Sequence, residues 1–186
     1  MKMLPDKKPY LGVVLFIFMT VSVLKTNAQL DTTGRIVPNG KLEWKYYIGQ
    51  IDSSSGYWAN THCNVNYRYI LTPSTGDTAK IFLYSWAVLQ NDSWVKPDKE
   101  SPELLEHEQG HLNFSMVCSL EFSKAVRSTS FLKTNCRKKI DSIFKTILSK
   151  YNRMEIQYDT ETNHFFNRVK QAEWNKTLET MLKTLQ

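Results

Sequence analysis

The sequence lacks the strong charge of one sign that is typical of a nucleic-acid-binding protein. Removing the four lysines and one aspartate of residues 1–28 from its 24 basic and 18 acidic residues leaves a net charge of +3. That charge is too small to indicate a nucleic acid or an anionic membrane surface as a partner. No stripe of basic residues interleaved with aromatic residues is present either. We therefore expect no nucleic acid as a partner.

The sequence also lacks an apolar run long enough to cross a membrane comfortably. The run at residues 11–24 is shorter than the roughly 20 residues of a transmembrane helix. Lys2, Lys7 and Lys8 precede it, and the small residue Ala28 follows it. This order is typical of a secretory signal peptide. We expect residues 1–28 to be removed, which leaves residues 29–186 as a domain outside the cytoplasm with no stable membrane span. An uncleaved anchor is the alternative.

Cysteine is scarce, and its spacing indicates no metal site. Cys63, Cys118 and Cys136 are the three cysteines, so an odd count leaves at least one thiol free. Export permits disulfides, and Cys118 with Cys136 is the candidate pair. Buried free thiols are the alternative.

The remaining pattern predicts one α+β domain. Hydrophobic residues make up 41% of the chain and charged residues 23%, which is typical of a globular protein. Aromatic, β-branched and alternating residues predict antiparallel strands in the first half, at 42–51, 64–71, 80–89 and 94–95. Ser101 and Pro102 are a helix start, and helices are expected at 102–127, 135–150 and 168–185. We expect a small antiparallel sheet packed on the first helix, followed by further helices.

The first of these helices carries the motif His107-Glu108-Gln109-Gly110-His111. Histidines four residues apart project from nearly the same face of a helix, which allows both to bind one Zn²⁺ ion. Glu108 then lies beside the ion, where it can take a proton from bound water. An ordinary amphipathic helix with two unrelated histidines is the alternative.

A catalytic zinc site needs a third protein ligand, which the motif does not supply. Glu121 lies about 15 Å along the helix from His111, too far to reach the same ion. The polar stretch 155–164 holds the candidates: His164 is preferred because zinc favours imidazole, and Asp159 and Glu161 are the alternatives.

Two further roles follow if His164 binds the metal. Asp159 would orient a ligand imidazole, and Tyr158 would donate a hydrogen bond to the oxyanion of the reaction. The segment Lys80–Leu89 is a candidate to receive an extended substrate, with a purely structural strand as the alternative. His62 is interpreted as a surface histidine.

The chain resembles the bacterial predicted secreted zinc-dependent proteases, a group also classed as a domain of unknown function. The resemblance covers most of the mature chain, through Leu42-Glu43-Trp44, Ser93-Trp94-Val95, Leu104 to His111, Tyr158 to His164 and Glu173-Trp174. It implies a zincin-like fold, His107 and His111 as zinc ligands, Glu108 as the catalytic acid and base, and His164 as the third ligand. Phe165 stands where that group tends to have Gly.

These observations predict an exported zinc metallopeptidase that hydrolyses peptide bonds of a peptide or protein substrate. The metal-bound water attacks the carbonyl, and Glu108 acts as general base. A zinc-binding envelope domain without turnover is one alternative. An adhesion or scaffold module with incidental histidines is another.

Overall fold

The structure, a computed structural model, describes residues 26–29, 33–72 and 74–186. Residues 1–25, which hold most of the expected signal peptide, lie outside this part of the chain. The expected cleavage point after Ala28 falls within the first strand, β1 (Thr26–Gln29). No helix in the described part is both long and apolar enough to cross a membrane.

Two antiparallel sheets form the β part of the fold. The larger one has the order β1-β4-β5-β2, with β7 also paired to β5. Its centre is the hairpin of β4 (Cys63–Thr72) and β5 (Thr78–Gln90). The short strands β2 (Gly34–Arg35) and β7 (Phe131–Leu132) join opposite ends of β5. A separate two-stranded sheet pairs β3 (Ala59–Asn60) with β6 (Trp94–Val95).

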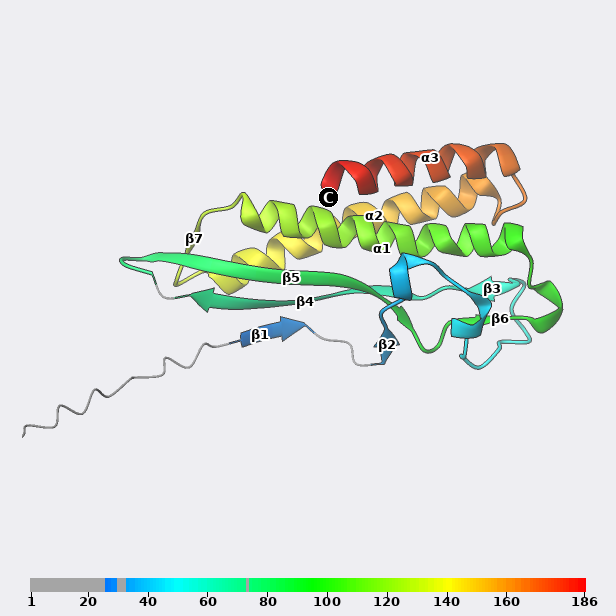
Figure 1. The fold of residues 1–186 in the computed structure, drawn as a ribbon, viewed down its shortest axis with the longest axis horizontal. Coiled ribbons are helices and arrows are strands. Elements are labelled where there is room, and N and C mark those ends of the chain that lie inside the picture. Colours follow the sequence, from blue (N-terminus) through cyan, green and yellow to red (C-terminus); the bar gives the residue numbers. More distant parts are fainter. Residues whose placement is uncertain (1–25, 30–32, 73) are drawn as a thin grey trace, which may run out of the picture.

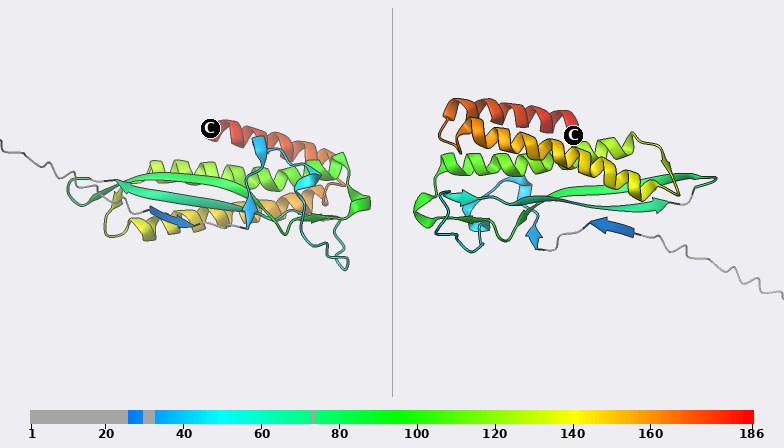
Figure 2. Two further views of the ribbon diagram at one scale, coloured as in Figure 1. Left: turned by 60° about the horizontal axis from the view of Figure 1, so that its bottom comes forward. Right: turned by 180° about the vertical axis from the view of Figure 1, so that it is seen from behind.

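Three helices lie together on one side of the larger sheet (Figure 1, Figure 2). They are α1 (Pro102–Arg127), α2 (Cys136–Thr162) and α3 (Arg168–Leu185). The hydroxyl oxygen of Ser101 accepts a hydrogen bond from the Leu104 amide at 3.1 Å, which starts α1 where the sequence predicts it. The expected α+β class, antiparallel pairing and three helices are confirmed.

The main core lies between the β4–β5 hairpin and the helices. Tyr67 and Phe122 bring the sheet and α1 together, with ring centroids 5.0 Å apart, and Phe144 of α2 completes the aromatic contact. A smaller core packs Val37 and Leu42 against Leu89 and Leu112. The sheet and α1 are therefore held in a fixed relation, which positions the motif on α1.

Two sequence predictions about the fold are wrong. Residues 42–51 form no strand: the Glu43 and Trp44 carbonyls accept hydrogen bonds from Tyr46 and Tyr47, which closes a 3-10 turn at Trp44–Tyr46. The second helix continues past Lys150 to Thr162 because its buried stripe continues through Tyr151 and Tyr158. Of the two alternatives left open for the cysteines, the structure has free thiols at Cys63, Cys118 and Cys136, and the candidate pair Cys118–Cys136 forms no disulfide.

The crossing of α1 over α2 depends on the absence of a side chain at Gly110. An added Cβ there would lie 2.2 Å from the Tyr158 hydroxyl oxygen and 2.5 Å from the ring carbon that carries it. Tyr158 is fully buried, so its ring has no free space to move into. The glycine therefore lets the two helices approach closely beside the motif.

We expect Gly110→Ala to destabilise the protein, although alanine is the better helix former by about 1 kcal/mol. The clash with a buried ring costs about 1–3 kcal/mol, which outweighs that gain. Urea unfolding followed by circular dichroism measures the difference. Gly56→Ala is the control, because a Cβ at Gly56 meets nothing within 4 Å. A higher unfolding midpoint for Gly110→Ala would contradict this packing.

Candidate metal centre

The two motif histidines lie on one face of α1, as the sequence predicts. Their ring centroids are 5.1 Å apart and their planes are nearly perpendicular, at 89°. His107 is buried, with 2% of its surface exposed, and His111 is partly buried. Both rings direct Nε2 toward the same carboxylate, which comes from α2.

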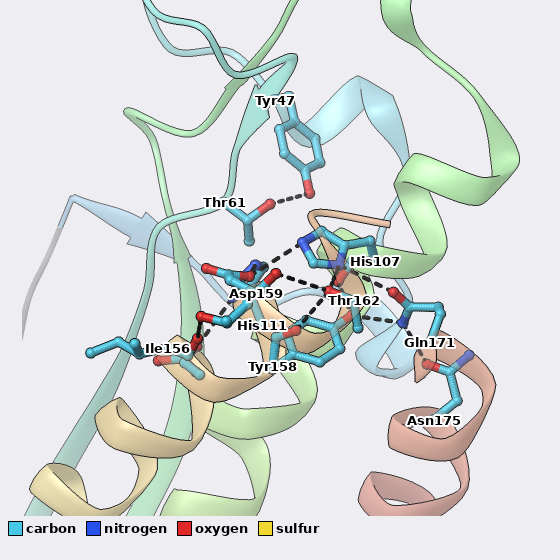
Figure 3. A network of polar contacts seen from close by, with 12 residues as sticks. Tyr47, Thr61, His107, His111, Ile156, Tyr158, Asp159, Thr162, Gln171 and Asn175 are labelled. Atoms are coloured by element: carbon cyan, nitrogen blue, oxygen red, sulfur yellow. Dashed lines mark hydrogen bonds and ion pairs between the residues drawn. The ribbon is translucent and has the colours of Figure 1, made fainter. Parts of the chain in front are cut away.

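That carboxylate belongs to Asp159, which lies one turn before the end of α2. Its Oδ1 atom is 3.3 Å from Nε2 of His107 and 3.2 Å from Nε2 of His111 (Figure 3). The ligand atoms of these three residues all lie within 4.8 Å of one another. They form the one group in the described part of the chain with the donors and the spacing to hold a metal ion.

The Asp159 Oδ1 atom is buried, yet it accepts no well-aligned hydrogen bond from the described residues. The Nε2 atoms of His107 and His111 lie within ion-pair distance of this oxygen, but neither contact has the geometry of a hydrogen bond. Buried carboxylate oxygens without a partner are costly and rare. Three ligand atoms that face a common point, rather than one another, fit a shared cation.

His164 lies outside this group, although it borders the same pocket. Its ring centroid is 6.3 Å from that of His107, and its ring packs against Tyr57 at 5.0 Å. In the candidate group the third donor is Asp159, one of the two alternatives that the sequence left open. The reason is that α2 continues to Thr162, so Asp159 projects from a helix toward α1 while His164 follows the helix end.

Glu161, the other alternative, faces α3. It accepts hydrogen bonds from Gln157 at 2.7 Å and from the indole of Trp174 at 3.0 Å. His62 pairs with Asp92 at the surface, as a non-ligand histidine would. Neither residue belongs to the candidate metal group.

A chain of hydrogen bonds fixes which nitrogen of His107 faces the group. The Tyr158 hydroxyl donates to the His107 carbonyl at 2.8 Å, so it must accept from the Gln171 amide nitrogen, 2.7 Å away. The Gln171 amide oxygen then accepts from Nδ1 of His107 at 3.1 Å (Figure 3). With its proton on Nδ1, His107 presents the Nε2 lone pair to the group.

His111 is oriented in a comparable way by a carboxylate. Its Nδ1 atom lies 3.4 Å from Oε1 of Glu155, one turn before Asp159 on α2. Gln171 and Glu155 were both missed by sequence reasoning. Gln171 is fully buried on the face of α3 that also holds Trp174 and Leu178. A polar residue at a position of this apolar stripe is the sequence signal that could have identified it.

Tyr158 does not have the role expected from the sequence. Its side chain is fully buried and stacks on His107, with ring centroids 4.7 Å apart, and its hydroxyl is occupied by His107 and Gln171. Burial raises the pKa of this hydroxyl, so it remains a neutral hydrogen-bond donor. The residue does not border the pocket, and its geometry supports positioning of His107 rather than contact with a substrate oxyanion.

The electrostatic field of the group favours a cation. Burial lowers the pKa of His111, but the adjacent carboxylates of Asp159 and Glu155 outweigh burial and raise that pKa to about 10. Burial raises the pKa of Asp159, yet His107 and His111 hold it below its usual range. The field that retains a proton on His111 also attracts a divalent ion, whose binding would release that proton.

The group opens into a pocket of about 540 Å³, within the usual range for ligand sites. Glu108 is buried, with 4% of its surface exposed, and contributes to the pocket wall beside His107 and His111. Segment 56–61, which includes β3, forms the facing wall, and residues 164–166 form a third side. A ligand in this pocket would reach both the candidate metal group and Glu108.

Residues 48–165 match the sequence profile of a family described as "Bacterial protein of unknown function (DUF922)". The match includes the motif helix and Asp159 but ends before Gln171. No curated protein and no solved structure matches the chain significantly.

Replacing Asp159 by alanine should weaken metal binding far more than replacing His164. Asp159→Ala removes one of three ligand atoms. The loss of zinc affinity should therefore exceed the roughly 10–100-fold lost when a residue that only orients a metal ligand is replaced. Titration of the metal-free protein with Zn²⁺ against a chromophoric chelator measures the affinity. His62→Ala is the control, since it removes a histidine outside the group. Equal loss in His164→Ala and Asp159→Ala would contradict this arrangement.

Proposed function

This chain belongs to the bacterial family of unknown function DUF922, and we propose that it is a zinc-dependent peptidase acting outside the cytoplasm. The observation that carries the proposal is the convergence of His107, His111 and Asp159 beside the buried carboxylate of Glu108 in one open pocket. The expected signal peptide supports the location.

The ligand set supports zinc as the metal. Two imidazole nitrogens and one carboxylate oxygen, with a fourth position left open, are typical of catalytic zinc sites. Donors at about 2.1 Å from a tetrahedral ion lie about 3.4 Å apart. The distances of 3.3 and 3.2 Å between Asp159 Oδ1 and the two Nε2 atoms are close to that separation. Two of the three separations between donor atoms therefore already suit a tetrahedral ion, and the third is at most 4.8 Å.

Glu108 supplies the acid–base step. Bound zinc would lower the pKa of a water molecule and polarise the scissile carbonyl. Glu108 takes the proton from the attacking water and later returns it to the leaving amine. The short HExxH spacing on α1 keeps this carboxylate next to the two histidines. Because Glu108 is buried, bulk solvent competes less for its proton.

The strand β3 is positioned to bind an extended substrate. Among the residues that the structure describes, it pairs along one edge only, with β6. On that side the Trp58 carbonyl accepts a hydrogen bond from the Lys96 amide at 2.8 Å. By strand alternation, the backbone N–H and C=O of Ala59 point to the other edge. This strand borders the pocket, whereas residues 80–89 do not, so we assign substrate pairing to β3 rather than to Lys80–Leu89.

A helix that carries HExxH and packs on an antiparallel sheet is the arrangement of the zincins, and we propose that relationship for this fold. The substrate is then a peptide or protein. A zinc-binding domain without turnover is the competing function, since it needs the same ligands but not Glu108.

Replacing Glu108 by glutamine separates these two functions. We expect Glu108→Gln to retain zinc and to lose at least about 100-fold in kcat/KM, because general acid–base catalysis contributes that much or more. Hydrolysis of a quenched-fluorescent peptide library and zinc content are measured on the same samples. Glu103→Gln, an exposed glutamate of the same helix, is the control. A zinc-loaded parent protein that cleaves no peptide would overturn the peptidase and favour the non-catalytic domain.

A further inference from the structure

Aromatic side chains from two distant segments meet at one side of the pocket. Trp58 precedes β3, and its ring centroid lies 5.4 Å from those of both Phe165 and Phe166. These two rings stack on each other at 4.2 Å. Tyr57 adds a fourth ring, which packs on His164. All four aromatic residues border the pocket together with the candidate metal group and Glu108.

Part of this aromatic wall is exposed. Tyr57 and Phe166 each leave 57% of their surface uncovered. Large exposed apolar side chains gathered at a pocket are typical of binding sites, because their burial by a ligand is favourable. Apart from the metal group, Glu108 and His164, every side chain that borders the pocket is uncharged. Lys99, whose Nζ lies 4.9 Å from the centroid of the Trp58 ring, is a charged neighbour of this wall that does not border the pocket.

The backbone at residues 163–165 adopts a left-handed conformation that residues other than glycine disfavour, and it holds part of this wall in place. Asn163, His164 and Phe165 have consecutive positive φ angles of 48°, 50° and 80°. Hydrogen bonds from the His164 amide to the Asp159 carbonyl at 3.1 Å and from the Asn167 amide to the Thr162 carbonyl at 2.7 Å close this turn. The turn begins at the end of α2, so the position of the aromatic rings is tied to the position of Asp159.

We propose that Tyr57, Trp58, Phe165 and Phe166 form a subsite that receives a bulky apolar side chain of the peptide, preferably an aromatic one. This substrate class rests on the proposed peptidase function. A peptide paired with β3 passes directly by Trp58, which places one of its side chains against the wall. Edge-to-face and stacked contacts with several rings favour an aromatic guest over an aliphatic one of similar size.

Peptide binding to the zinc-loaded Glu108→Gln protein tests the subsite without turnover. The probes are fluorescein-labelled hexapeptides of alanine and glycine that carry one Phe, Leu, Ser or Asp, followed by fluorescence anisotropy. We expect the Phe peptide to bind at least about tenfold more tightly than the Ser peptide, because filling an apolar pocket increases affinity by about that factor. The Asp peptide should also bind more weakly than the Phe peptide.

The matched variants are Phe166→Ala and Phe82→Ala in the same Glu108→Gln background. Phe82 has a similar exposed fraction, 60%, but lies on β5 away from the pocket. We expect Phe166→Ala to abolish most of the preference for the Phe peptide, Phe166→Leu to keep part of it, and Phe82→Ala to keep all of it. Equal affinity for all four peptides, no measurable binding, or equal loss in both alanine variants would overturn the subsite.

The two proposals fail separately. Cleavage of the four peptides by the zinc-loaded parent without preference for Phe or Leu would overturn the subsite and leave the peptidase standing. Selective binding of the Phe peptide with no cleavage by the parent would support the subsite and overturn the peptidase.

Discussion

The interaction on which the candidate site depends is the approach of one buried carboxylate oxygen to two imidazole nitrogens. Asp159 Oδ1 lies between the Nε2 atoms of His107 and His111 but is not aligned to accept a hydrogen bond from either. Such an arrangement is unfavourable for the protein alone and favourable once a cation occupies the common point. A cation bound at this candidate group would therefore link α1 to α2.

The surrounding structure serves to hold these three side chains. Gly110 allows Tyr158 to pack directly on α1, and the Tyr158 hydroxyl and Gln171 together fix the tautomer of His107. Glu155 does the same for His111 from the preceding turn of α2. Each of the three helices thus contributes one part: ligands from α1, a ligand and an orienting carboxylate from α2, and an orienting amide from α3.

What the sequence predicted correctly depends on local periodicity. The helical face shared by His107 and His111 needs only a four-residue spacing, and the alternation of β4 is equally local. His164 was preferred over Asp159 and Glu161 as the third ligand because zinc favours imidazole, and the expected end of α2 at Lys150 left Asp159 in a loop. The buried positions Ile147, Tyr151, Tyr158 and Thr162 continue the helical stripe, so the spacing of these residues in the sequence already indicates a helix that extends beyond Lys150.

Other features of the site are not local and were not predictable in this way. The role of Gln171 depends on a residue 64 positions away. Residues 42–51 have the composition of a strand, but they turn and pack beside α1. There the Gln109 side chain donates a hydrogen bond to the Gly40 carbonyl and accepts one from the Leu42 amide. Tertiary packing overrides composition in such a segment.

A crystal structure of the zinc-loaded protein, with anomalous scattering recorded on both sides of the zinc absorption edge, tests the account most directly. It predicts one anomalous peak at about 2.0–2.2 Å from Nε2 of His107, Nε2 of His111 and a carboxylate oxygen of Asp159, with an open position toward Glu108. A zinc peak bound elsewhere, or a site in which Asp159 takes no part, would contradict it.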